Sequence, residues 1–83
     1  MISFFRKIFN QNLITVDFAV ANLSNIWEKI TEELSKEAGL TQAGVDLSNN
    51  RLSYLLHPDF WTIEKLKDRI EKLGGKVTGI EKR

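Results

Sequence analysis

The stretch LITVDFAVANLSNIWEKITEEL, residues 13–34, changes its hydrophobic period partway along and so decides the fold. Large apolar residues first alternate with smaller or polar ones, as in a β-strand with one buried face. The inward-facing residues are Ile14, Val16, Phe18 and Val20. From Asn22 the spacing becomes that of an amphipathic helix of about four turns, which we expect to end at Gly39.

The predicted helix begins in a segment rich in side chains that cap N-termini, namely Asn22, Ser24 and Asn25. Its outer face is charged along its whole length. These charged residues are Glu28, Lys29, Glu32, Glu33 and Lys36. Such a face is typical of a solvated helix, so we expect it to face water and to have no catalytic role.

The rest of the chain repeats the same two patterns. Alternating stretches on either side of SNN, residues 48–50, predict a β-hairpin. Pro58 ends the second strand, and Thr62 is placed to cap a second helix that stops at Gly74-Gly75. A short last strand, KVTGI, follows with Val77 inward.

The predicted order is therefore strand, helix, strand, strand, helix, strand. This is the order of an α+β, ferredoxin-like βαββαβ sandwich, a four-stranded antiparallel sheet with both helices on one face. We assign residues 13–83 to this domain and residues 1–12 to a separate N-terminal amphipathic segment.

Composition excludes several classes of function. The 83 residues contain no cysteine, which rules out thiol chemistry, and 12 basic against 11 acidic residues give a net charge of only +1. No Ser/His/Asp set or glycine-rich phosphate loop occurs, so we expect no enzyme and no cofactor. RNA binding by this topology needs aromatic residues interleaved with basic ones on the central strands, and the strand RLSYLLH offers only Tyr54 and Arg51. We therefore expect no nucleic-acid partner. No segment is long enough to span a bilayer or to serve as a secretory signal, so the expected location is cytoplasmic.

Residues 38–77 resemble the heavy-metal-associated domain family, which includes copper chaperones and the N-terminal modules of metal-transporting ATPases. The similarity lies in the motifs Gly39-Leu40, Val45-Asp46-Leu47, His57-Pro58-Asp59 and Glu71-Lys72-Leu73-Gly74. It extends over about residues 13–81 without an insertion and implies the same ferredoxin-like fold.

The family's metal-binding loop does not carry over to this chain. A Met-x-Cys-x-x-Cys motif at the first strand–helix junction would place its methionine at Ala21 and its cysteines at Leu23 and Ile26. None of these side chains coordinates a soft metal ion. Gly75 stands where an aromatic residue often lies near the metal. Two interpretations of Leu23 and Ile26 stay open: they close one end of the core, or they form an apolar patch for a partner.

Other candidate residues lie between the hairpin and the second helix. His57 and Asp59 offer a weak alternative metal site with hard or borderline ligands, joined by Asp17 or the region of Met1, and a partner chain would have to complete it. Phe60 and Trp61 either form an exposed aromatic anchor or close the core.

The N-terminal segment MISFFRKIFNQN is strongly amphipathic when drawn as a helix. One side carries Ile2, Phe4, Phe5, Ile8 and Phe9. We expect this side to pack on the domain or on a second copy of the chain. The alternative is association with a membrane surface through residues 1–10, with Arg6 and Lys7 toward anionic headgroups.

Taken together, these patterns predict a non-enzymatic binding or regulatory module related to metal-transport proteins that has lost its thiolate site. The expected partner is another protein or a second copy of the chain. Its candidate contact residues are Leu23, Asn25, Ile26, Phe60 and Trp61. The alternatives are a metal-binding accessory protein with non-thiol ligands and a membrane-surface adaptor.

Overall fold

The computed structural model describes residues 13–83, and the amphipathic helix expected over residues 1–12 lies outside them. The described chain forms six elements in the predicted order. They are β1 (Ile14–Val20), α2 (Leu23–Leu34), β2 (Leu40–Asp46), β3 (Arg51–Leu56), α3 (Ile63–Lys72) and β4 (Val77–Lys82). The predicted alternation of strands and helices is confirmed.

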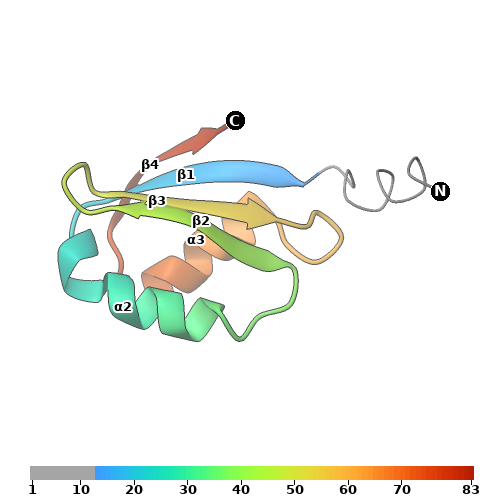
Figure 1. The fold of residues 1–83 in the computed structure, drawn as a ribbon, viewed down its shortest axis with the longest axis horizontal. Helices are drawn as coiled ribbons and strands as arrows, with labels where there is room; N and C mark the ends of the chain where they lie inside the picture. The colour runs from blue at the N-terminus through green and yellow to red at the C-terminus, as the bar shows by residue number, and fades with distance from the viewer. Residues whose placement is uncertain (1–12) are drawn as a thin grey trace.

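The four strands form one antiparallel sheet in the order β2-β3-β1-β4. Both helices lie beneath the same face of this sheet, and no described element covers the other face (Figure 1). This α+β arrangement is compatible with the predicted ferredoxin-like fold.

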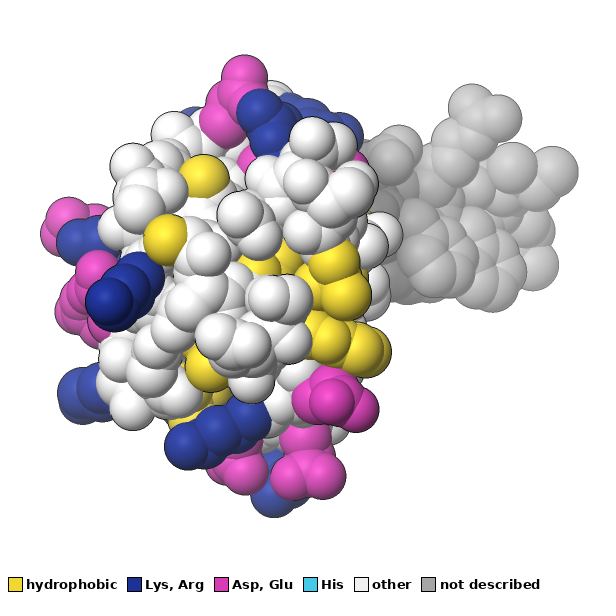
Figure 2. All heavy atoms as spheres, turned by 90° about the vertical axis from the view of Figure 1, so that its left-hand side faces the viewer, with side chains coloured by type: hydrophobic (Ala, Val, Ile, Leu, Met, Phe, Trp, Pro, Cys, Tyr) yellow, Lys and Arg dark blue, Asp and Glu magenta, His cyan; other side chains and the backbone are white. Residues whose placement is uncertain are grey.

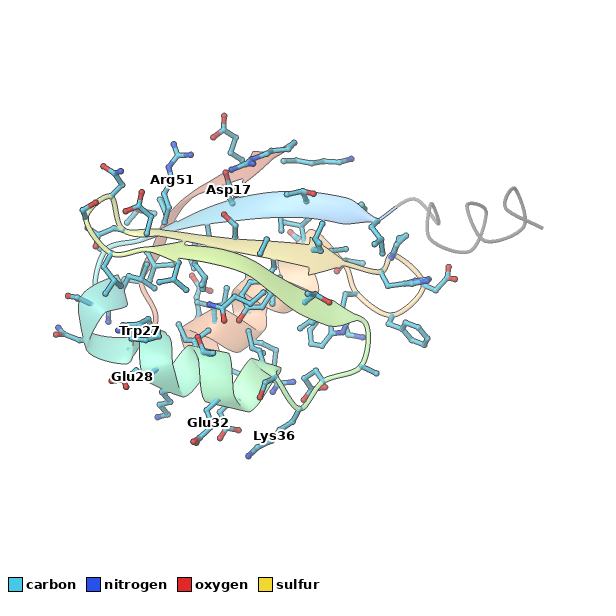
Figure 3. All side chains as sticks on the ribbon, viewed as in Figure 1. Asp17, Trp27, Glu28, Glu32, Lys36 and Arg51 are labelled. Carbon is cyan, nitrogen blue, oxygen red and sulfur yellow. The ribbon has the colours of Figure 1, made fainter. Side chains whose placement is uncertain are left out.

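The hydrophobic core lies between the sheet and the two helices. Of the inward residues of β1 predicted from the alternation, Val16, Phe18 and Val20 are fully buried, and Ile14 is partly buried against them. They meet the inward face of β3 and the apolar stripes of both helices. The other buried core residues are Leu23, Ile30, Leu34, Leu52, Tyr54, Leu56, Trp61, Leu66 and Ile70. Glu28, Glu32 and Lys36 point away from the sheet, as the sequence predicted (Figure 3).

The first helix differs from its prediction at both ends. Asn22 occupies the N-cap position, but its side chain makes no capping hydrogen bond. The helix ends at Leu34 with Ser35 as its C-cap, well before Gly39. Gly39 has a φ of +82° and shapes the turn into β2 instead. Ser35 donates from its hydroxyl to the Glu32 carbonyl at 2.8 Å, and such a local side-chain bond competes with a further helical turn.

The second helix and the hairpin agree closely with the predictions made from the sequence. Thr62 caps α3, accepting a hydrogen bond at its Oγ1 from the Lys65 N–H at 3.0 Å. In the β2–β3 turn, Asn50 adopts a φ of +55°, which asparagine tolerates better than most residues. The Asp46 carboxylate accepts hydrogen bonds from Ser48 and Asn49, and these bonds lower its pKa.

Candidate functional site

The β1–α2 junction is closed by an amide side chain. Asn22 donates from Nδ2 to the Gly74 carbonyl at 2.9 Å and accepts at Oδ1 from the Lys76 N–H at 2.9 Å. The Ala21 N–H also donates to the Lys76 carbonyl at 2.8 Å. The junction is thus joined directly to the α3–β4 connection.

The residues at the two cysteine positions pack inward rather than toward solvent. Leu23 is completely buried in the core, so it offers no surface to a partner. Ile26 is half-buried and lies against Gly75. A Cβ added to Gly75 would stand only 3.0 Å from the Ile26 Cδ1. Of the loop residues proposed to contact a partner, only Asn25 is exposed.

The end of the molecule that carries this junction shows no charged area of one sign. Figure 2 looks onto that end, where basic and acidic side chains are interspersed. Within residues 13–83, no three His, Asp or Glu side chains gather in a way that could hold a metal ion. His57 and Asp59 do meet, with Nδ1 and Oδ2 3.8 Å apart, and the Asp59 N–H donates to the same Nδ1 at 3.3 Å.

The two aromatic residues of the β3–α3 loop have opposite environments. Trp61 is only 7% exposed, and its indole N–H donates to the Ala38 carbonyl at 2.8 Å. Lys65 and Arg69 place their cationic groups 5.5 Å and 6.0 Å from its ring centre. Trp61 therefore closes the core and pins the loop. Phe60 is 57% exposed and is the only one of the pair that a partner can reach.

A second feature lies on the sheet face opposite the helices. Asp17 points there from the middle of β1, as does Arg51 from β3 (Figure 3). The Asp17 carboxylate is nonetheless only 2% exposed, because other side chains surround it. Ser53 donates to Oδ1 at 2.5 Å, and Arg83 donates to Oδ2 from Nη2 at 2.7 Å and from Nε at 3.0 Å.

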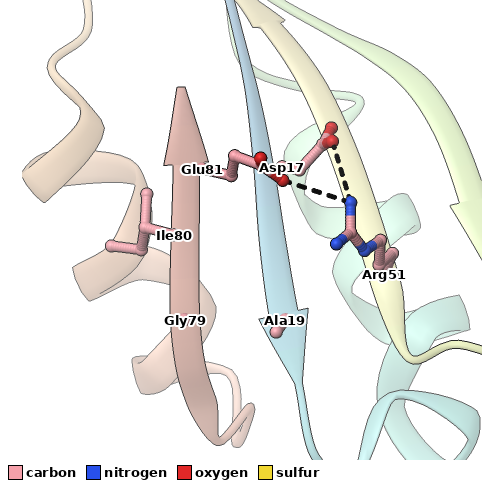
Figure 4. A pocket seen from close by; sticks show the side chains of 6 residues that line it. All are labelled: Asp17, Ala19, Arg51, Gly79, Ile80 and Glu81. Carbon is pink, nitrogen blue, oxygen red and sulfur yellow. Dashed lines mark hydrogen bonds and ion pairs between the residues drawn. The ribbon is translucent and has the colours of Figure 1, made fainter. Parts of the chain in front are cut away.

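Arg51 extends this cluster toward the edge strand. Its Nη1 lies 3.5 Å from Asp17 Oδ2 and 3.3 Å from Glu81 Oε1, so it joins the two carboxylates (Figure 4). The Ser53 hydrogen bond, with the Arg83 and Arg51 charges, lowers the pKa of Asp17 against the opposing effect of burial. The carboxylate is thus held ionised and fully paired.

Beside this cluster the sheet face has a shallow hollow of about 210 Å³. Its lining residues are Asp17, Ala19, Arg51, Gly79, Ile80 and Glu81 (Figure 4). The hollow exists because Ala19 and Gly79, which pair across β1 and β4, carry little or no side chain. The Arg51 guanidinium that lines it is already shared between Asp17 and Glu81, which leaves a weak field for a charged ligand.

The sequence did not predict the burial of Asp17. Its alternation with Val16 and Phe18 correctly placed it on the outer face, where an exposed carboxylate is the ordinary expectation. Arg83 and Arg51, which cover it, lie 66 and 34 residues away along the chain. The only signal of this burial in the sequence was a charged residue at the centre of an alternating strand.

The chain matches no protein-family model, and no curated protein matches its sequence. Neither helix in the described part of the chain combines the length and apolar character needed to cross a bilayer.

Proposed function

We propose that this chain is a non-enzymatic protein-binding module of the ferredoxin-like fold, related to heavy-metal-associated domains but without their thiolate loop. The positions that would carry the metal ligands serve the fold: one is buried, one packs on Gly75, and Asn22 beside them ties two connections together. These contacts support a binding function that does not depend on metal.

The observation that carries the proposal is the presentation of Phe60. This ring is the most exposed of the large hydrophobic side chains among residues 13–83. The loop beneath it is fixed, because Trp61 is anchored on Ala38 and the Phe60 and Trp61 N–H groups both donate to the His57 carbonyl at 3.0 Å. An exposed aromatic ring on a rigid support is typical of interface hot spots, since little entropy is lost when it is buried.

Neighbouring residues extend this surface. The His57 ring lies 5.2 Å from the Phe60 ring, at a tilt of 56°. An apolar area of this kind fits a protein partner, including a second copy of the chain, better than a charged ligand.

The test compares two surface substitutions of the same kind. Phe60→Asp should abolish a complex with a copurified partner, or weaken self-association at least tenfold by analytical ultracentrifugation, because an ionised group cannot be buried unpaired. Leu47→Asp is the matched control, since Leu47 is 41% exposed in the turn at the other end of β3. Equal effects of both changes, or none from Phe60→Asp, would contradict the proposed surface.

Metal titration provides the second measurement. Calorimetry with Cu(I) and Zn(II) should show no tight, stoichiometric binding by the isolated chain. A stoichiometric isotherm that disappears in His57→Ala would instead support the alternative of a metal-binding accessory protein.

A further inference from the structure

The outer face of the sheet carries a leucine on a central strand. Leu55 alternates with Tyr54 and Leu56, which are buried in the core, so it lies on the face that no described element covers (Figure 1). It is half-buried and takes no part in the core. The open face of an antiparallel sheet normally carries polar residues. A leucine at this place indicates that another part of the protein covers it.

The neighbours of Leu55 on this face are uncharged. Leu55 pairs with Thr15 of β1 on one side and with Thr41 of β2 on the other, which forms a row across three strands. The Asp17 cluster lies farther along β1 and β3, and its charges pair with one another. The row therefore presents methyl and hydroxyl groups, and it suits an apolar occupant better than a charged one.

The chain has one segment outside the described residues, and its sequence fits this row. Drawn as a helix, MISFFRKIFNQN carries its large apolar residues on one side. These residues are Ile2, Phe4, Phe5, Ile8 and Phe9. Only Leu13 and Ile14 separate the segment from Thr15. An uncovered part of the sheet and an apolar segment are thus joined directly along the chain.

The dimensions of the segment also match the row. A helix rises about 1.5 Å per residue, so residues 2–9 would extend over about 12 Å. Three neighbouring strands, spaced about 4.8 Å apart, span about 10 Å. The connection Asn10, Gln11 and Asn12 reaches up to about 10 Å, roughly the separation of packed layers, and asparagine is suited to turns. A helix lying across the strands can therefore extend from β1 over β3 to β2.

We propose that residues 2–9 form a helix that docks on the outer face of the sheet, with its apolar side over Thr15, Leu55 and Thr41. This arrangement leaves Arg6 and Lys7 toward solvent. The segment docks on its own domain rather than on a second copy, because the short tether gives a high effective concentration. The docking is separate from the Phe60 surface and does not depend on it.

The experiment is a nuclear Overhauser measurement on the full chain, with the oligomeric state of the same sample determined by analytical ultracentrifugation. We expect contacts between the rings of Phe5 or Phe9 and the methyl groups of Leu55, Thr15 or Thr41 in a monomer. In a mixture of isotope-labelled and unlabelled chains, no such contact should join two copies.

Two matched substitutions each add one carboxylate to the segment. Phe5→Asp, on the apolar side, should abolish the contacts of the remaining rings with the sheet, because an ionised group cannot be buried unpaired. It should also shift the amide resonances of Thr15, Thr41 and Leu55. Ser3→Asp, on the polar side, should leave the contacts and the resonances unchanged.

Several results would overturn the proposal. They are the absence of ring contacts with the outer face, contacts that join two copies, contacts with Phe60 in place of Leu55, and equal spectra for Phe5→Asp and the unchanged chain. Sedimentation with anionic vesicles that is lost in Phe5→Asp, without any contact to Leu55, would instead support association with a membrane. Phe60→Asp should leave the docking contacts intact, so this proposal and the proposed binding surface can fail separately.

Discussion

Ile26 and Gly75 fit against each other so closely that a side chain at position 75 has no room. A Cβ at Gly75 would stand 3.0 Å from Ile26 Cδ1, 2.7 Å from Ile70 Cγ2 and 3.1 Å from the Ile70 carbonyl oxygen. The two positions are those of a metal-binding cysteine and its neighbouring aromatic in the family that the sequence resembles. Here they form a packing contact between the start of α2 and the α3–β4 connection.

This contact predicts a large effect for Gly75→Ala. The added methyl group overlaps Ile70, including its backbone, so the substitution should lower the free energy of unfolding by about 1–3 kcal/mol, the usual cost of overpacking. Gly44→Ala is the control, because nothing lies within 4 Å of its added Cβ. Urea denaturation of both variants measures the difference, and equal stabilities would contradict the contact.

The Asn22 side chain should stabilise the fold rather than cap the helix. Asn22→Ala removes both its hydrogen bonds, to Gly74 and Lys76, and should cost about 1–2 kcal/mol. Asn25→Ala, an exposed change in the first turn of α2, should alter stability by less than about 0.5 kcal/mol. Slower amide exchange at Lys76 in the unchanged chain than in Asn22→Ala would verify the bond. A destabilisation by Asn25→Ala as large as that by Asn22→Ala would refute it.

Asp17 should make the protein sensitive to acid. Its pKa is lower in the folded state than its ordinary value of 3.8, so the unfolded chain binds the proton more readily. The stabilisation is therefore complete above pH 3.8 and is lost as the pH falls through the folded-state pKa. Asp17→Asn should be less stable at pH 7 by about 1–3 kcal/mol, in the range of hydrogen bonds to charged groups.

Urea denaturation of Asp17→Asn and the unchanged chain between pH 2 and 7 tests this relationship. The two stabilities should converge toward the acid end of the range. Asp46→Asn serves as a comparison, because the Asp46 pKa is lowered only by the local hydrogen bonds of an exposed turn. Parallel pH profiles for Asp17→Asn and the unchanged chain would show that the Asp17 cluster does not stabilise the fold.

Tyr54 should make the protein sensitive to alkali. Burial raises the pKa of its hydroxyl from 10.0 to about 12, so the folded chain retains the proton more strongly than the unfolded chain. Stability is unaffected below pH 10 and declines between pH 10 and about 12, by up to about 3 kcal/mol. Tyr54 is the only tyrosine, so absorbance at the tyrosinate wavelength reports on it alone.

The measurement is an alkaline titration followed by absorbance and circular dichroism together. Tyrosinate should form near pH 12 or coincide with unfolding. Tyr54→Phe should lose less stability over the same range, which separates the tyrosine from the lysines that also titrate there. Ionisation at pH 10 in a folded chain would contradict the burial of the hydroxyl.

The sequence by itself determined the elements and the face that each buries. Alternation fixed which residues of β1 point inward, since neighbouring side chains of a strand point to opposite faces. Thr62 and Asn50 likewise marked a helix start and a turn through local backbone chemistry. These features depend on residues a few positions apart, and their signal is therefore contained in short segments.

Only the tertiary structure decided the burial and the partners of residues that face outward from the core or whose sequence pattern fits two roles. Asp17 is buried because Arg51 approaches it from β3 and Arg83 from just beyond the end of β4. Asn22 bonds across the fold to Gly74 and Lys76 instead of capping its own helix. Trp61 closes the core while the adjacent Phe60 is exposed, although both are large aromatic residues of one loop. Each outcome depends on groups brought close by sheet pairing and helix packing, and local sequence patterns carry no information about such partners.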